Sequence, residues 1–333
     1  MTTDQATDLR NLFSSNRGAG GKESVGPATA EAVPSERKGR VSFGPSTRTR
    51  PVRVRSPRLT QAVAVASGKG GVGKSNLSLN LAIEVARTGR RVAIFDADLG
   101  CANVDVLCNL QVRSTLADVI SGKRRLAEIM VKVPGVRGRG GVGLVPGASG
   151  VMELASLNAT QRTMVIEQLA ALEQVVDLVI IDVGAGIAAD AIGFARAADS
   201  VLLTCTPEPT AMTDAYAAAK LMLSNNEAPD LSLVVNMVGN EEEGRAVHRR
   251  MDQVARRHLG RGLELAGVVP FDFSVVAAVK RRKPLALESP DALATRAIRT
   301  IAHSLITDPP VTERSTRKPG FLTGLLRSLA RER

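Results

Sequence analysis

A glycine- and lysine-rich loop at residues 68–75 constrains the fold of this chain more than any other segment. It satisfies the pattern G-x-x-x-x-G-K-[ST], in which backbone N–H groups and a lysine cradle phosphates. Residues 62–66 before the loop predict a short buried strand, and residues 76–87 after it predict an amphipathic helix. This order predicts an α/β fold with a phosphate site at the N-terminus of the helix.

The residue types in the loop suit the binding of a nucleotide. Lys74 places a positive charge against the β- and γ-phosphates, and the Ser75 hydroxyl can ligate Mg²⁺. Lys69 is a second lysine, which we expect to point outward and to reach a nucleotide across a dimer interface. The candidate nucleotide-binding residues of this segment are Gly68, Lys69, Gly70, Gly71, Val72, Gly73, Lys74, Ser75 and Asn76.

Two further apolar segments predict buried strands that end near carboxylates. Residues 91–95 are followed by Asp96 and Asp98, and residues 177–182 end in Asp182. Carboxylates at the carboxyl ends of strands, beside a phosphate loop, can orient Mg²⁺ waters and the attacking water. For each acid alone, a helix N-cap is the alternative role.

The segment K-G-G-V-G-K-S resembles the deviant phosphate-binding motif of the MinD/ParA family of P-loop ATPases. This resemblance implies ATP and Mg²⁺ as ligands, and a sandwich homodimer in which Lys69 contacts the partner subunit's ATP. The two acidic segments resemble the family's switch regions, so Asp98 would position the attacking water and Asp182 would lie near Mg²⁺ through water. The implied catalytic residues are Lys69, Lys74, Asp98 and Asp182, and the implied metal-binding residues are Ser75, Asp98 and Asp182.

Two later strands resemble the adenine pocket of the same family. Residues 232–236 end in Asn236, whose amide can both donate to and accept from a purine edge. Residues 267–272 end in Pro270, Phe271 and Asp272. We expect Asn236, Pro270 and Asp272 to bind the nucleotide, although an Asn at the end of a strand can also be only a turn residue.

Composition and charge narrow the function classes. Three cysteines without a C-x-x-C pair give no support to a disulfide framework or to an iron–sulfur site. The net charge of +11 is uneven, since residues 1–60 carry +6 and residues 280–333 carry +7, which leaves −2 between them. Because the core is not basic, we expect no nucleic-acid partner for it. We expect the charged tails to be solvated, with a contact to acidic lipid, RNA or another partner as the alternative. No spanning helix or secretory signal is apparent, so we expect a cytoplasmic protein.

The chain divides by composition into five segments. Alternating strands and amphipathic helices predict a doubly wound, mostly parallel sheet with helices on both faces. Low apolar content with many Gly, Ser, Pro and Arg residues predicts a disordered basic linker. The predicted segments are a motif at 1–13, the linker at 14–58, the ATPase domain at 59–306, a spacer at 307–318 and a C-terminal helix at 319–333.

The N-terminal segment D-Q-A-T-D-L-R resembles the head of FlhG-type flagellar ATPases. In that family the head stimulates the GTPase activity of the flagellar protein FlhF, with its glutamine inserted at the active site. The resemblance implies an FlhF-like GTPase as a partner. The implied partner-binding residues are Asp4, Gln5, Ala6, Leu9 and Arg10.

The C-terminal segment 319–333 predicts a short amphipathic helix, with arginines opposite a stripe of large apolar residues. Such a helix suits an anionic membrane surface, and it resembles the membrane-targeting helix of the same family. The alternative is a terminal helix that docks on the protein's own core. The candidate membrane residues are Phe321, Leu322, Leu325, Leu326 and Leu329.

Together these features predict an ATPase that dimerises with ATP, binds the inner face of the cell membrane reversibly and regulates flagellar number and placement. Flagellar C-ring proteins or a flagellar transcription regulator are further partners to consider. The alternatives are a MinD/ParA-type ATPase for division-site placement or for partition of DNA or cargo. The slightly negative charge of residues 61–279 disfavours DNA partition.

Overall fold

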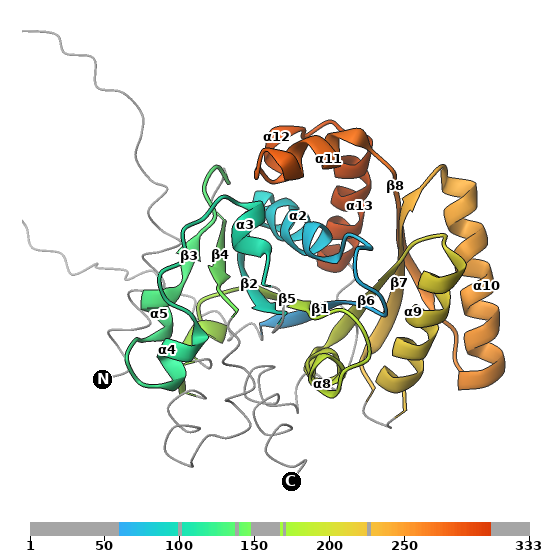
Figure 1. Ribbon diagram of the computed structural model, residues 1–333, viewed down its shortest axis with the longest axis horizontal. Helices are drawn as coiled ribbons and strands as arrows, with labels where there is room; N and C mark the ends of the chain where they lie inside the picture. Colours follow the sequence, from blue (N-terminus) through green and yellow to red (C-terminus); the bar gives the residue numbers. More distant parts are fainter. Residues whose placement is uncertain are drawn as a thin grey trace, which may run out of the picture.

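An eight-stranded sheet forms the centre of the molecule, and helices cover both of its faces (Figure 1). The computed structural model describes residues 60–98, 102–136, 140–147, 167–168, 171–224 and 228–307. The predicted head, linker and C-terminal helix lie outside these residues, as does all of the spacer except its first residue, so they remain predictions.

The strands run in the order β3-β4-β2-β5-β1-β6-β7-β8. All neighbours are parallel except β3 and β4, which are antiparallel. This confirms the predicted mostly parallel sheet. The bounds are β1 Gln61–Ser67, β2 Arg91–Ala97, β3 Val131–Lys132, β4 Gly141–Val145, β5 Leu178–Val183, β6 Ser200–Cys205, β7 Asp230–Val238 and β8 Glu264–Pro270.

The helices fall into two layers, each with its own hydrophobic cluster. One cluster joins the sheet to α2, α3, α11, α12 and α13, and the other joins it to α4, α5, α8, α9 and α10. The bounds are α2 Lys74–Arg87, α3 Val104–Leu107, α4 Leu116–Ile120, α5 Leu126–Ile129, α8 Ala189–Ala197, α9 Pro209–Met222, α10 Glu241–Leu259, α11 Phe273–Lys280, α12 Leu285–Glu288 and α13 Leu293–Thr307.

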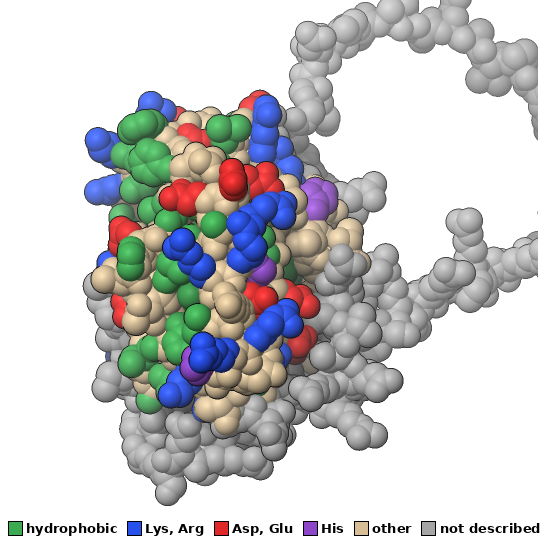
Figure 2. Space-filling model, turned by 90° about the vertical axis from the view of Figure 1, so that its right-hand side faces the viewer, with side chains coloured by type: hydrophobic (Ala, Val, Ile, Leu, Met, Phe, Trp, Pro, Cys, Tyr) green, Lys and Arg blue, Asp and Glu red, His purple; other side chains and the backbone are tan. Residues whose placement is uncertain are grey.

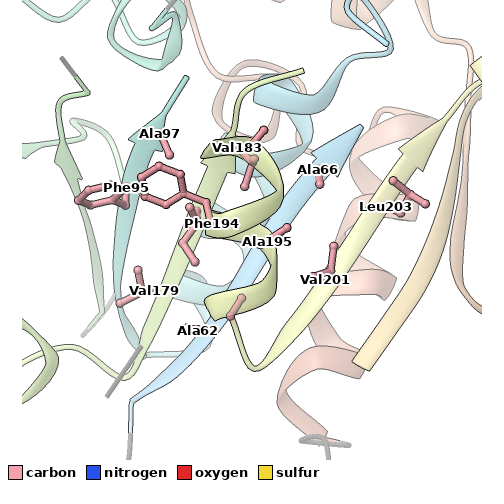
Figure 3. Close-up of a cluster of buried hydrophobic side chains, with 14 of the residues drawn as sticks. Ala62, Ala66, Phe95, Ala97, Val179, Val183, Phe194, Ala195, Val201 and Leu203 are labelled. Carbon is pink, nitrogen blue, oxygen red and sulfur yellow. The ribbon is translucent and has the colours of Figure 1, made fainter. Parts of the chain in front are cut away.

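The central strand β1 shows why the sheet is covered on both sides. Successive side chains of a strand point to opposite faces, and those of Ala62 to Ala66 are apolar and at most 1% exposed. Val63 and Val65 belong to the cluster under α2 and α13, whereas Ala62 and Ala66 belong to the other. Figure 3 shows α8 lying across the strands at this second cluster. There the Phe194 ring of α8 lies 6.1 Å from that of Phe95.

The strand order brings the predicted chemical residues to one edge of the sheet. In parallel strands the carboxyl ends lie together, and β5 lies between β1 and β2. The register pairs Asp182 of β5 with Val65 of β1 on one side and with Asp96 of β2 on the other. The phosphate loop follows β1 directly, so it meets both acidic segments at this edge.

Candidate functional site

The loop between β1 and α2 needs glycine at two positions for reasons visible in the structure. Gly73 has a φ of +86°, and an added Cβ would collide with the side-chain nitrogen of Asn236. At Gly68 an added Cβ would collide with the backbone of Asp214 in α9. Tight packing on both sides therefore fixes the path of the loop, and α2 begins at Lys74 with its N-terminus toward the loop.

Lys74 is the buried cation of the site. Its side chain is 7% exposed, and its Nζ lies 2.8 Å from Asp182 Oδ1 and 3.9 Å from Asp98 Oδ2. The hydroxyl of Ser78, one turn later in α2, donates to the same Asp182 oxygen at 2.9 Å. The structure thus brings three of the four predicted catalytic residues together.

One oxygen of Asp182 is available for a further ligand. Its carboxylate is 0% exposed, and Oδ2 is buried without a hydrogen-bond partner. Ser75 is also close, since its Oγ lies 3.4 Å from Lys74 Nζ. Hard oxygen donors with room for water and phosphate suit Mg²⁺, which rarely takes an all-protein cage. The described residues hold no cluster of three or more His, Cys, Asp or Glu that could bind a metal ion.

Asp96 is a member of the site that our sequence reasoning did not single out. It is 2% exposed, and its carboxylate accepts from the backbone nitrogens of Asp98 and Val104 at 3.2 and 3.3 Å. Burial and the neighbouring charge of Asp182 raise its pKa to about 7, from 3.8. Asp96 thus fixes the backbone that carries Asp98. The signal was present, since Asp96 directly follows the apolar run of its strand.

Lys69 lies apart from these residues, at the exposed start of the loop. Its Nζ lies 3.1 Å from Glu208 Oε2 and 3.1 Å from Thr210 Oγ1, both at the beginning of α9. The side chain is 41% exposed, so it is accessible from outside the subunit. This position is compatible with the predicted contact across a dimer, which remains a prediction.

A pocket on the other side of the loop collects the residues predicted to bind the base. Asn236 donates from Nδ2 to the carbonyl of Val72 at 2.8 Å, so its amide is fixed against the loop. The lining residues include Gly73, Asn76, Asn236, Met237, Pro270, Phe271 and Asp272.

The carboxylate of Asp272 has a structural contact in the same pocket. It accepts from Ser274 N at 2.8 Å as the N-cap of α11, and from Ala294 N at 3.2 Å at the start of α13. Burial alone would raise the pKa of Asp272, but these backbone hydrogen bonds outweigh it and lower the pKa. Contacts of Asp272 with a nucleotide therefore remain a prediction.

Comparison with known proteins identifies the family. The family described as "ParA: NUBPL iron-transfer P-loop NTPase" matches residues 58–306. The antiactivator FleN of Pseudomonas aeruginosa is 39% identical over 245 residues, which cover 74% of this chain and 86% of that protein. The flagellum site-determining protein YlxH of Helicobacter pylori is 35% identical over 252 residues, with 74% and 82% covered.

A solved structure agrees with the fold. The septum site-determining protein MinD of Pyrococcus horikoshii, complexed with Mg-ADP, superposes with a TM-score of 0.60. The match covers 75% of this chain and 97% of that one, at 22% sequence identity. The fold, the loop and the sequence matches agree, and the chain therefore belongs to the ParA/MinD family of P-loop NTPases.

Proposed function

We propose that this chain is an Mg²⁺-dependent ATPase that dimerises when ATP binds and regulates the number and placement of flagella. The observation that carries the proposal is the pair of sequence relatives. Both are at least 35% identical over about three-quarters of the chain, and one is named an antiactivator, the other a flagellum site-determining protein. The buried lysine and carboxylates at the carboxyl edge of the sheet support the ATPase part.

Within one subunit, the loop and Lys74 bind the phosphates. The backbone N–H groups at the N-terminus of α2 and the Lys74 ammonium stabilise the negative charge that the terminal phosphates carry. Ser75 would hold Mg²⁺ directly and Asp182 would hold it through water, and the ion would supply positive charge next to the phosphate oxygens. The partnerless Asp182 Oδ2 supports this role, since a ligand or its water would satisfy that buried oxygen.

Asp98 orients the attacking water. Its carboxylate lies at the mouth of the site, with Oδ2 3.9 Å from Lys74 Nζ and a side chain that is 20% exposed. The Asp96 carboxylate accepts a hydrogen bond from the backbone N–H of Asp98, and this contact limits the positions that the Asp98 carboxylate can reach. Because a water must be placed in line with the bond that breaks, this control of position contributes to hydrolysis.

Lys69 acts in the partner's site after a dimer forms. It must leave Glu208 and Thr210 to do so, and both partners of that ion pair are largely exposed. An exposed ion pair contributes at most about 1 kcal/mol. The negative phosphates of a second subunit's ATP can therefore displace Glu208 as the partner of Lys69.

The remaining parts of the proposal rest on segments outside the described residues. The head at 1–13 would stimulate an FlhF-like GTPase through Gln5, and the helix at 319–333 would bind an anionic membrane from the cytoplasmic side. A C-ring protein or a flagellar transcription regulator would be a further partner. No helix among the described residues is long and apolar enough to span a membrane.

Other functions of the family have weaker support. Division-site placement would follow from the likeness to MinD, but the septum site-determining protein MinD of Bacillus subtilis is 32% identical to this chain, below the 39% and 35% of FleN and YlxH. Iron transfer, which the family's description names, needs accessible thiolates. Burial raises the pKa of Cys205 to about 12, and burial with the charge of Asp105 does the same for Cys108, so neither of these two described thiols ionises readily. Cys101 lies outside the described residues.

The test is a count of flagella in cells. In the organism of origin, deletion of the gene should change the number or position of flagella per cell. The wild-type gene should restore the pattern, whereas Asp98→Ala should not, because it would remove the hydrolysis step that resets the dimer. A deletion strain with an unchanged flagellar pattern would contradict the proposal.

A further inference from the structure

Exposed apolar side chains gather around α11, and two of them, Phe271 and Val276, also line the base pocket. Five of the ten exposed large hydrophobic side chains in the described residues lie here, and we call them the α11 patch. Its members are Phe271, Phe273, Val276, Val279 and Leu293, with Phe273 78% and Leu293 63% exposed. The rings of Phe271 and Phe273 meet edge to face with centroids 5.1 Å apart. Such a concentration on a folded surface marks a contact site.

Local structure holds this patch in place. Asp272 caps α11 and also accepts from Ala294 N, so the beginnings of α11 and α13 lie side by side. That contact brings Phe273 and Leu293, the first residues of the two helices, to the same part of the surface. Along α11, Val276 and Val279 follow Phe273 at helical spacing, while Ala278 is buried. The apolar surface is therefore fixed by the fold.

Basic residues border the patch. Lys280, Arg281, Arg282 and Lys283 follow Val279 without interruption. Arg281 and Lys283 share Glu288, at 2.5 and 3.4 Å, whereas no described acid forms an ion pair with Lys280 or Arg282. Residues 271–299 hold six Lys and Arg against three Asp and Glu. Part of the basic charge that we assigned to the C-terminal tail thus lies on the folded domain, beside its exposed phenylalanines.

We propose that the α11 patch with Lys280 and Arg282 docks on an anionic lipid bilayer. The inference extends the proposed function, because it assigns the folded domain a membrane contact separate from residues 319–333. Exposed Phe and Leu side chains enter the interfacial region of a bilayer, and cations beside them are attracted to anionic headgroups. Figure 2 shows hydrophobic side chains beside Lys and Arg at the top of the molecule, the end where Figure 1 places α11 and α12.

Charge complementarity favours a bilayer over a core segment of another protein. An apolar face that binds a protein core is commonly depleted of lysine at its centre, whereas this one ends in four consecutive cations. The two contacts of each subunit would act together, since binding through one raises the effective concentration of the other at the same surface. A dimer would carry two copies of each contact. Because ATP drives dimerisation in the proposed function, attachment to the membrane would depend on ATP.

The experiment measures flotation of the full chain with vesicles, in the presence of ATP and Mg²⁺. Vesicles of phosphatidylcholine with about one-third phosphatidylglycerol are compared with vesicles of phosphatidylcholine alone. The apolar variant is Phe273→Ser with Leu293→Ser, and the charge variant is Lys280→Gln with Arg282→Asn. These residues do not line the base pocket, and Asn suits the φ of +53° at residue 282.

Matched control variants place the same changes on other exposed helix surfaces. Leu221→Ser with Val254→Ser alters exposed apolar residues of α9 and α10, and Arg250→Gln with Arg257→Gln removes exposed charge from α10. We expect each α11 variant to lower the bound fraction on anionic vesicles by about tenfold. The controls should bind like wild type, and all proteins should dimerise with ATP.

The outcomes separate this inference from the proposed function. Wild-type protein that does not float with anionic vesicles would overturn both membrane contacts. Wild-type binding that Leu325→Glu weakens but the α11 variants leave unchanged would overturn the inference alone. An equal loss in the α11 and control variants would also overturn it, because the attraction would then be a property of total charge. A loss confined to the α11 variants supports it.

Discussion

The two lysines of the phosphate loop lie in opposite surroundings, five residues apart. Lys74 is 7% exposed and pairs with a fully buried Asp182, whereas Lys69 is 41% exposed and pairs with Glu208, itself 66% exposed. The strands and α2 fix Lys74 and Asp182, whereas two exposed side chains at the beginning of α9, Glu208 and Thr210, hold Lys69. We call the Lys74 side the fixed end of the loop and the Lys69 side its releasable end. In the proposed function, the fixed end binds the subunit's own nucleotide and the releasable end that of a second subunit.

Lys74→Ala should have the largest effect, because it leaves the buried Asp182 carboxylate without its cation. We expect the free energy of unfolding to fall by about 3 kcal/mol and ATP hydrolysis to fall by about 1,000-fold. The matched variant Lys69→Ala should lower the free energy of unfolding by less than about 1 kcal/mol, since its pair is exposed. Urea denaturation without nucleotide measures both, and equal losses would contradict the proposed difference between the two ends.

Asp98→Ala should separate binding from hydrolysis. The variant keeps Lys74, Ser75 and Asp182, so it should bind ATP and Mg²⁺ normally. It lacks the carboxylate that orients water, so turnover should fall by about 100-fold. Phosphate release and size-exclusion chromatography with ATP would then show an inactive dimer. Glu242→Ala, a change to an exposed acid of α10, should behave like wild type. A fully active Asp98→Ala protein would remove the assigned role.

Asp96 makes the fixed end sensitive to pH. Because folding raises its pKa from 3.8 to about 7, the folded protein retains a proton that the unfolded chain releases. Stability should therefore fall as the pH rises from about 4 to about 7, by on the order of 3 kcal/mol. The stability of the Asp96→Asn variant should change little over the same pH range. Urea denaturation of wild type and of Asp96→Asn at several pH values, with EDTA and without nucleotide, gives the free energy of unfolding of each. If this free energy depended on pH in the same way for both proteins, the role assigned to Asp96 would be wrong.

Glu208→Gln should have the smallest effect, at the releasable end. The change weakens the partner that competes with the second subunit's ATP for Lys69. We expect the ATP concentration for half-maximal dimerisation to fall about threefold. Glu241→Gln weakens another exposed ion pair, with Arg245 of α10, and should leave that concentration unchanged. A higher ATP requirement for Glu208→Gln would mean that this glutamate supports dimerisation.

The sequence was enough to bring the loop, Asp98 and Asp182 to one edge of the sheet, because a short motif marks each of them, whereas their roles in catalysis stay predictions. The loop, Asp98 and Asp182 each stand at the end of an apolar run, and parallel pairing brings such ends together whatever the loops between them do. The strand bounds differ by only a few residues, and β7 is longer than its predicted 232–236, because its ends are also paired with β6 and β8.

Features that depend on contacts distant in sequence could not be predicted in the same way. Glu208 meets Lys69 across 139 residues, and nothing in the spacing of either reveals the other. The cap that Asp272 provides joins α11 to α13 over 22 residues. The raised pKa of Asp96 needs its burial and its register with Asp182, which only the folded sheet provides.

The central claim is that the exposed end of the loop serves a second subunit. Multi-angle light scattering of Asp98→Ala and of Asp98→Ala with Lys69→Ala, both with ATP and Mg²⁺, tests it most directly, with bound nucleotide measured in the same fractions. We predict a dimer for the single variant, and a monomer that still carries ATP for the double variant. A double variant that remains a dimer, or one that loses ATP, would contradict the claim.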